Sequence, residues 1–167
     1  MERTFFIADT HFGDKSIISY ENRPFENIFK MDKTIIDNWN STVNDEDTVF
    51  LLGDFSSYGI EKNIQICSQL KGRKILVMGN HDTESEKYYF KCGFSSVSRY
   101  PIIYENFWIL SHEPMYINSN MPYANIFGHV HNNPLYTDYS KQSFCASAER
   151  INYTPIEFNI IKKMITE

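Results

Sequence analysis

The first half of the chain alternates short apolar runs with longer stretches in which apolar residues recur every three or four positions. The apolar runs span residues 4–8, 47–52 and 73–78, and each is followed directly by Gly or Asp. The stretches between them, 26–43 and 60–70, have helical spacing. Compact apolar runs predict buried strands, and the helical spacing predicts helices packed on one face. The order strand, helix, strand, helix, strand predicts a parallel sheet with right-handed crossovers.

The second half carries more strand-like segments than helical ones. Residues 84–92 predict a short helix, and the apolar segments 97–104, 107–110 and 124–127 after it predict strands. The sequence has no internal repeat, low-complexity stretch or linker. Its length of 167 residues therefore predicts one domain over residues 1–167.

Two further segments are marked by proline. Residues 12–26 contain Gly13, Asn22 and Pro24, so we expect a loop over the strand ends. Thr154 and Pro155 predict the N-cap and first residue of a closing helix. The apolar face expected for that helix consists of Ile156, Ile160, Ile161, Met164 and Ile165.

Composition narrows the class of protein. A hydrophobic content of 42% argues against disorder, and a net charge of −5 without a dense basic block disfavours binding of long nucleic acid. The three cysteines are too few and too irregularly spaced for a disulfide framework or a thiolate zinc site. The chain shows no signal-peptide pattern and no apolar stretch of membrane-spanning length. We therefore expect a cytoplasmic protein without a membrane partner.

Polar residues gather where the predicted strands end. Asp9 and His11 follow the first strand, Asp54 follows the second just past a glycine, and Asn80 follows the third after Gly79. Because parallel strands end along one edge of a sheet, these side chains are expected to converge. All five histidines lie at or just beyond a predicted strand end, and they are His11, His81, His112, His129 and His131. A set of turn and helix-capping residues is the alternative for any one of these segments.

Nitrogen and oxygen donors without thiolate suit two divalent ions from the set Mn, Fe, Zn, Mg, Co and Ni. Two ions would leave positive charge that favours a phosphate group and lowers the pKa of a bridging water. Arg23 lies between Tyr20 and Phe25, and its guanidinium is a candidate for binding a substrate phosphate. Pairing of Arg23 with a surface carboxylate is the alternative.

Five segments in order resemble the signature motifs of the calcineurin-like metallophosphoesterases. They are Asp9-Thr10-His11, Gly53-Asp54, Gly79-Asn80-His81-Asp82, His112 and Gly128-His129-Val130-His131. The chain looks most like the small bacterial and phage members, which lack cap domains. The resemblance implies an α/β fold, a four-layer α/β/β/α sandwich with two mixed β-sheets and a dinuclear metal site at the strand ends.

The resemblance also implies roles for individual residues. Asp9, His11 and His131 would hold the first metal, and Asn80, His112 and His129 the second, with Asp54 bridging both and Mn as the expected metal. Asn80 would also face the substrate. His81 would stabilise charge on the phosphoryl oxygens or protonate the leaving group. Many members carry an Asp where this chain has Ser57, so Asp82 or a backbone carbonyl is expected to orient His81 instead.

The function that the resemblance implies is metal-dependent hydrolysis of a phosphoester, with in-line attack by a metal-bridging hydroxide. We expect a phosphodiesterase rather than a phosphomonoesterase, acting on a small phosphoester or nucleotide. Two alternatives stand beside it. One is a binding scaffold like the related retromer subunit, which lacks catalytic groups. The other is a nuclease similar to the double-strand-break repair members.

Overall fold

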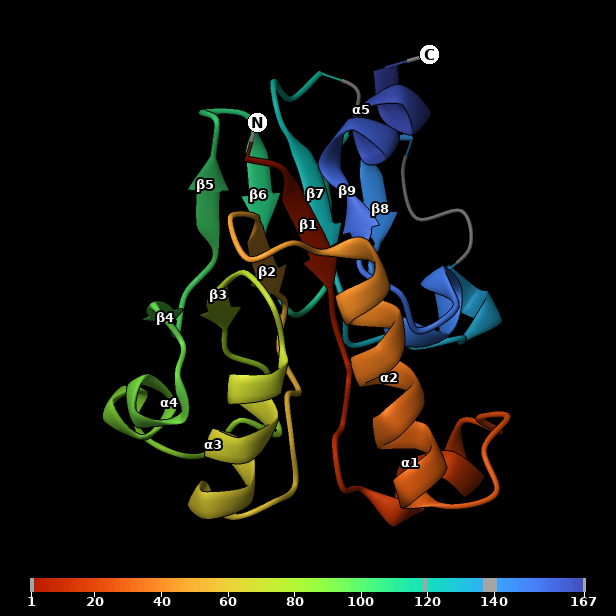
Figure 1. Cartoon of the computed structure of the whole chain (residues 1–167). Coiled ribbons are helices and arrows are strands. Elements are labelled where there is room, and N and C mark those ends of the chain that lie inside the picture. Colours follow the sequence, from red (N-terminus) through yellow and green to blue (C-terminus); the bar gives the residue numbers. More distant parts are fainter. Residues whose placement is uncertain (1, 119, 137–140, 167) are drawn as a thin grey trace.

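The computed structural model describes residues 2–118, 120–136 and 141–166. These residues form two sheets with helices packed around them (Figure 1), and the first sheet has five strands. Their order across the sheet is β4-β3-β2-β1-β9. The strands are β1 (Thr4–Ile7), β2 (Thr48–Leu51), β3 (Arg73–Val77), β4 (Ser96–Ser98) and β9 (Ile156–Glu157). The first four run parallel, as the alternation of strands and helices predicts, and β9 pairs with β1 in the antiparallel sense. The carboxyl ends of β1, β2 and β3 therefore lie along one edge.

The second sheet has the order β5-β6-β7-β8. Its strands are β5 (Ile102–Tyr104), β6 (Trp108–Leu110), β7 (Ala124–Phe127) and β8 (Ser143–Cys145). β5 is antiparallel to β6, whereas β6, β7 and β8 run parallel. The strand expected over 97–104 is in fact two strands in different sheets. The chain crosses between the sheets at Pro101, which has no N–H to continue a ladder.

Three helices cover the outer face of the first sheet, and they are α2 (Ile28–Thr42), α3 (Ile60–Gln69) and α4 (Glu86–Cys92) (Figure 1). α2 begins where Asn27 caps the Lys30 N–H at 3.0 Å, and α4 begins where Ser85 caps Tyr88. The apolar residues that recur every three or four positions in the sequence form the buried faces of these helices. In α2 these include Met31, Ile35 and Trp39, which pack against the first sheet.

A second apolar core lies between the two sheets. Phe6 of β1 stacks on Phe50 of β2 with ring centroids 5.3 Å apart, and Trp108 of β6 belongs to the same cluster. The closing helix α5 (Phe158–Thr166) inserts Phe158 and Ile161 into this core at the edge formed by β8 and β9. The predicted α/β fold with two mixed sheets is thereby confirmed.

The sequence prediction places the start of the closing helix too early. Ile156 and Glu157 pair with Phe6 and Phe5 of β1, so the segment after Pro155 is a strand and the helix begins at Phe158, three residues after the predicted start at Pro155. Of its predicted apolar face, Ile160 and Met164 are 46% and 63% exposed. The pairing energy with β1 outweighs the capping signal at Thr154 and Pro155.

The expected loop over 12–26 contains a helix, α1 (Lys15–Tyr20). Asp14 caps it by accepting a hydrogen bond from the Ser16 N–H at 2.8 Å, and Ile17 packs into the core. Two short 3-10 helices complete the described chain, η1 (Pro134–Tyr136) and η2 (Ala148–Ile151). None of the helices in the described ranges has the length and hydropathy needed to span a bilayer.

Candidate metal centre

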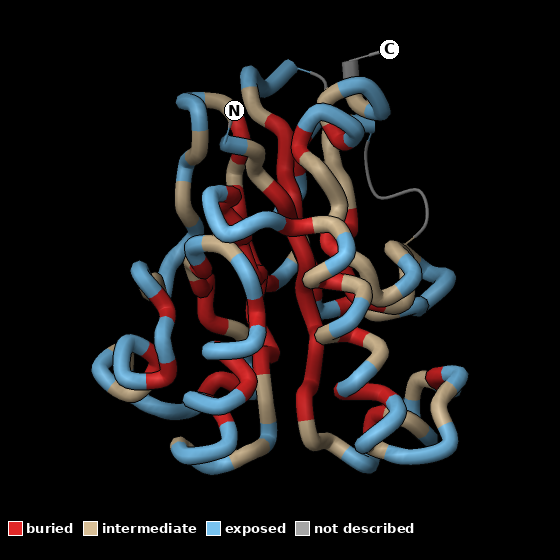
Figure 2. The backbone as a smooth tube through the Cα atoms, viewed as in Figure 1, coloured by how far each residue is buried: buried red, intermediate tan, exposed pale blue. Residues whose placement is uncertain are grey.

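The predicted ligands come from five loops that follow the carboxyl ends of strands. Figure 2 shows that burial continues from the strands into the segments just beyond them. Asp9 and His11 follow β1, Asp54 follows β2, and Asn80 follows β3. The second sheet contributes His112 after β6, and His129 and His131 after β7. The structure brings all seven side chains together at this edge, although they span residues 9 to 131.

One group of donors consists of Asp9, His11, Asp54 and His131. Each offers one ligand atom, and these atoms lie within 4.8 Å of one another. His11 Nε2 lies 3.4 Å from Asp54 Oδ2, and the His11 and His131 rings are 5.2 Å apart. Among the described residues His11 Nε2 is buried without a hydrogen-bond partner. A buried ring nitrogen facing carboxylates and another imidazole fits a divalent cation as its partner.

A second group consists of Asn80, His112 and His129, with Asp54 shared. Asn80 Oδ1 lies 2.9 Å from both His112 Nε2 and His129 Nδ1, and these two nitrogens are 3.1 Å apart. His112 Nε2 is also 3.4 Å from Asp54 Oδ2. Two imidazole nitrogens, an amide oxygen and a carboxylate oxygen therefore converge on one point. This donor set also fits a divalent cation.

Hydrogen bonds behind the ligands fix which atom faces the centre. His112 Nδ1 lies 2.8 Å from the carbonyl oxygen of Leu52, which can only accept, so Nδ1 donates to this oxygen and Nε2 is the nitrogen that faces the centre. Both oxygens of Asp9 accept the backbone N–H of His129, at 3.1 and 2.9 Å. The loops of the two sheets are therefore joined directly at the site.

The metal-free site is strongly polarised. Burial alone would raise the pKa of Asp54, but the His11 and His112 imidazoles, each 3.4 Å from its Oδ2, lower that pKa well below its ordinary value. Burial would lower the pKa of His112, but the Asp54 carboxylate at 3.4 Å and the charge of Asp9 raise that pKa to about 9. The cluster thus attracts positive charge even without an ion.

The predicted site residues differ in solvent exposure, with a buried set and an exposed rim. Asp9, His11, Asp54 and His112 are buried, whereas Asn80 and His129 are exposed. His81 is also exposed, and its ring lies 5.2 Å from that of His11. A substrate therefore reaches the centre from the side of these three exposed residues.

The ligand loops have unusual backbone conformations. Five of the seven predicted ligands have φ between 47° and 68°, and they are Asp9, His11, Asp54, His129 and His131. L-residues seldom occupy this left-handed region, and each such residue costs about 1–3 kcal/mol. Gly79 is needed for a different reason, because a Cβ there would lie 2.7 Å from the Asp54 nitrogen. Only glycine therefore fits at this position without displacing Asp54.

Asp82 has a role other than the one expected. Its carboxylate accepts the backbone N–H groups of Asp54 at 2.8 Å, Phe55 at 3.1 Å and Gly79 at 2.8 Å. Because these bonds occupy both oxygens, Asp82 joins the loops after β2 and β3 instead of orienting the His81 ring. His81 is held through its backbone N–H, which donates to Asp54 Oδ1 at 2.9 Å. No hydrogen bond of the His81 ring is present within the described ranges.

Arg23 does not lie where a substrate-binding residue would. Its side chain is fully buried, and its donors reach the carbonyl oxygens of Asp9 and Thr10 and the Glu149 carboxylate. The prediction of a phosphate contact from Arg23 is therefore corrected. Glu149 itself was missed, because it follows the unpredicted strand β8 and belongs to none of the five motifs.

The centre opens into shallow hollows. One of about 350 Å³ is lined by Asp54, Asn80, His129 and Tyr136, and another of about 570 Å³ is lined by His11, His131 and Tyr20 among others. His81 borders both, and it also borders a third hollow of about 460 Å³ that includes Tyr88. Space for substrate therefore lies on more than one side of His81.

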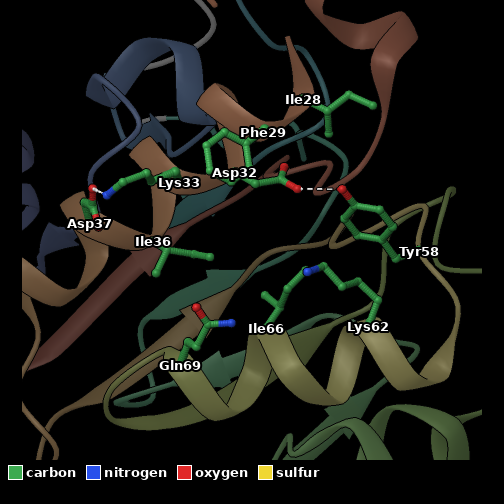
Figure 3. Close-up of a pocket in the computed structure, with 10 residues that line it drawn as sticks. All are labelled: Ile28, Phe29, Asp32, Lys33, Ile36, Asp37, Tyr58, Lys62, Ile66 and Gln69. Carbon is green, nitrogen blue, oxygen red and sulfur yellow. Dashed lines mark hydrogen bonds and ion pairs between the residues drawn. The ribbon is translucent and has the colours of Figure 1, made fainter.

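A further groove of about 500 Å³ lies between α2 and α3, on the helical side of the first sheet (Figure 3). In it the Tyr58 hydroxyl donates to Asp32 Oδ2 at 2.9 Å, and Asp32 Oδ1 accepts the Gly13 N–H at 3.2 Å. Burial and the neighbouring Asp32 raise the pKa of Tyr58 to about 12. None of the five histidines lines this groove. Through Gly13 and Tyr58, the Asp32 carboxylate holds the segments after β1 and β2 from the helical side of the sheet.

The chain is similar in sequence to proteins from an archaeon and a phage. The chain is 35% identical to the uncharacterized protein MJ1445 of Methanocaldococcus jannaschii, over 99% of this chain and 92% of the relative. A shorter match to the Gene 66 protein of Mycobacterium phage L5 is 36% identical and covers 49% of this chain and 41% of that protein.

Two solved structures are similar in fold. The protein of unknown function AQ665 from Aquifex aeolicus has a TM-score of 0.78 at 30% identity, covering 98% of this chain and 100% of that one. Nuclease MPE of Pseudomonas putida has a TM-score of 0.54 at 19% identity, covering 78% of this chain and 62% of that one. At this identity the second likeness concerns the fold alone. Residues 2–155 match the sequence pattern described as calcineurin-like phosphoesterase. The chain therefore belongs to the calcineurin-like phosphoesterase family.

Proposed function

We propose that this protein is a phosphodiesterase that binds two divalent ions, with Mn²⁺ as the preferred metal. The observation that carries the proposal is the convergence of two donor groups on a shared carboxylate, Asp54. Asp9, His11 and His131 would hold one ion, and Asn80, His112 and His129 the other. When bound, such ions supply positive charge and Lewis acidity to a phosphoester.

The residues around the donors have their own tasks. Asp54 accepts the His81 N–H, so the loop that presents His81 is fixed to the shared ligand. The exposed His81 ring is available to donate to a phosphoryl oxygen or to protonate the leaving alkoxide. Asn80 is on the exposed rim, and its side-chain N–H₂ is a second donor for the substrate.

A diester is favoured over a monoester by the space around the site. A diester carries two organic substituents, which need room on two sides of the phosphorus. Hollows on different sides of His81 provide that room. An exposed site of this kind suits a small phosphoester or a nucleotide. The three cysteines are free and buried, which supports the reducing cytoplasm as the compartment.

Hydrolysis assays with Mn²⁺ test the proposal. Bis(nitrophenyl) phosphate should be cleaved faster than nitrophenyl phosphate, and a chelator should abolish both reactions. Asp54→Asn should lose more activity than the ~10–100-fold cost of losing an outer partner of a metal ligand. Asp37→Asn, at an exposed ion pair with Lys33, is the matched control and should retain full activity. Absence of hydrolysis, or equal activity of Asp54→Asn and wild type, would refute the proposal.

A nuclease is the second candidate, because a structural neighbour is named as one. The net charge of −5 weighs against tight binding of long strands. Labelled single-stranded DNA and RNA belong in the same assay for this reason. Cleavage of these strands with higher kcat/KM than the small diester would favour the nuclease over the small-molecule phosphodiesterase.

A further inference from the structure

A buried ion pair lies directly behind the first donor group. Arg23 NH2 is 2.6 Å and Arg23 Nε is 2.8 Å from Glu149 Oε1. The Arg23 side chain is fully buried, and that of Glu149 is 4% exposed. An apolar pair of similar volume would stabilise the core about equally well, because the cost of desolvating two charges offsets most of the attraction between them. Its contribution to stability therefore does not explain the pair.

The remaining donors of Arg23 reach the loop that carries two ligands. NH2 donates to the carbonyl oxygen of Asp9 at 2.6 Å, and NH1 donates to that of Thr10 at 3.0 Å. Asp9 and His11, on either side of Thr10, have left-handed backbone conformations. A guanidinium that binds two successive carbonyl groups resists relaxation of this loop to an ordinary conformation.

Glu149 reaches the other ligand of the same group. Its Oε1 lies 3.0 Å from His131 Nδ1. With Nδ1 donating to this carboxylate, Nε2 is the nitrogen of His131 left for a metal ion. A carboxylate on the second imidazole nitrogen fixes the tautomer and orientation of a metal-binding histidine.

We infer that Arg23 and Glu149 are positioning residues, which together hold His131 and the Asp9–His11 loop in the arrangement that the first metal ion requires. This inference rests on the proposed metal-dependent function. Neither residue belongs to the five motifs, and neither needs to touch substrate. The pair acts through the three ligands Asp9, His11 and His131.

A third cation site is the competing explanation for Glu149. Glu21, His131 and Glu149 have ligand atoms within 4.8 Å of one another, and Glu149 Oε2 has no hydrogen-bond partner within the described ranges. The Arg23 guanidinium already supplies a positive charge 2.6 Å from Oε1 of the same carboxylate. A cation beside it would face like-charge repulsion in a buried setting, which favours the positioning role.

The test is a calorimetric titration of metal-free protein with Mn²⁺. The main variant is Arg23→Met/Glu149→Leu, which removes both charges together and so leaves no unpaired buried ion. Wild type should bind two ions. The double variant should bind one of them ~10–100-fold more weakly and the other with unchanged affinity. Arg3→Met/Asp47→Leu is the matched control, since this ion pair of 2.7 Å lies away from the centre, and it should leave both affinities unchanged.

An NMR measurement on Zn²⁺-loaded protein provides a readout that general loss of stability would not change. Wild type should show a slowly exchanging, downfield Nδ1 proton of His131, which the double variant should lack. If the double variant does not fold, Glu149→Gln replaces it, because the amide keeps the shape of the carboxylate without its charge. In Glu149→Gln the Nδ1 proton should shift upfield and one affinity should fall.

Three results would overturn the inference. They are unchanged affinity at both sites in a folded double variant, an unchanged Nδ1 resonance in Glu149→Gln, and a third Mn²⁺ in wild type that Glu21→Gln removes. Failure of the proposed function gives a different pattern. In that case wild type binds two ions and the double variant binds one of them more weakly, but neither protein hydrolyses a phosphoester.

Discussion

Replacing Asp82 by Asn tests how the loops of the metal centre are held together. Asp82 is 4% exposed, and its two oxygens accept three backbone N–H groups from the loops after β2 and β3. Asn can keep its oxygen in the place of Oδ2, which serves Asp54 and Gly79. Its N–H₂ group then faces the N–H of Phe55, so that this buried donor loses its partner.

The cost follows from these three bonds. A buried donor without a partner costs about 1–3 kcal/mol, and hydrogen bonds to a charged acceptor are worth about 1 kcal/mol more than neutral ones. One lost partner and two weakened bonds give a destabilisation of about 3–5 kcal/mol. A domain of this size has a stability of about 5–15 kcal/mol, so the variant should still fold.

Urea unfolding of the metal-free protein measures this difference, with the buried Trp39 and Trp108 as fluorescent probes. Asp37→Asn is the control, because its side chain is 60% exposed and its ion pair is worth about 0–1 kcal/mol. A loss of less than about 1 kcal/mol in Asp82→Asn would refute the assigned role. Activity should fall as well, because Asp54 and Asn80 depend on the loops that Asp82 joins.

Three further predictions follow from other parts of the structure. Gly79→Ala should destabilise the protein by about 1–3 kcal/mol in the same unfolding assay, because the added methyl group collides with Asp54. Gly59→Ala, where a Cβ meets nothing within 4 Å, should be nearly neutral, and equal effects of the two changes would contradict the steric argument. Asp47→Asn should reduce the loss of unfolding free energy that the protein undergoes as the pH falls into the acid range. Burial alone would raise the pKa of Asp47, but hydrogen bonds and an arginine partner lower it below 3.8, so its contribution is present above pH 3.8 and is lost as the pH falls through the lowered pKa. Unfolding free energies that fall with acid equally in variant and wild type would show that this carboxylate is not responsible. His81→Ala should lower kcat by about 10²–10⁴-fold while metal content, measured by elemental analysis, stays the same, and a loss of bound metal would make His81 a ligand instead.

The sequence predicts the parts of the fold that depend on local periodicity. The helix expected over 26–43 is α2, Ile28–Thr42, because one face of it meets the apolar core continuously. The helix α1 was missed since its six residues bury only Ile17, which is too little for a periodic signal. Strand β8 has three residues, too few for a periodic signal, and it is defined by its pairing with β7.

In the site, too, features that depend on sequence neighbours could be predicted, whereas contacts between distant segments could not. The convergence of Asp9, Asp54 and Asn80 could be predicted, because each follows a parallel strand and the carboxyl ends of parallel strands lie along one edge of the sheet. The roles of Arg23 and Asp82 could not be read in this way. Arg23 binds Glu149, which is 126 residues away, and the partners of Asp82 are backbone N–H groups that leave no trace in the sequence.

The left-handed backbone of the loops that carry the predicted ligands limits how far selection can raise the stability of this fold. At Asp9, His11, Asp54, His129 and His131 the backbone favours Gly or Asn, whereas the chemistry of cation binding favours carboxylate and imidazole. Changes toward Gly at these five positions would relieve strain and delete ligands in the same step. Screens that select only for heat resistance should therefore enrich inactive variants at these positions, and stabilising changes compatible with activity should lie elsewhere in the chain.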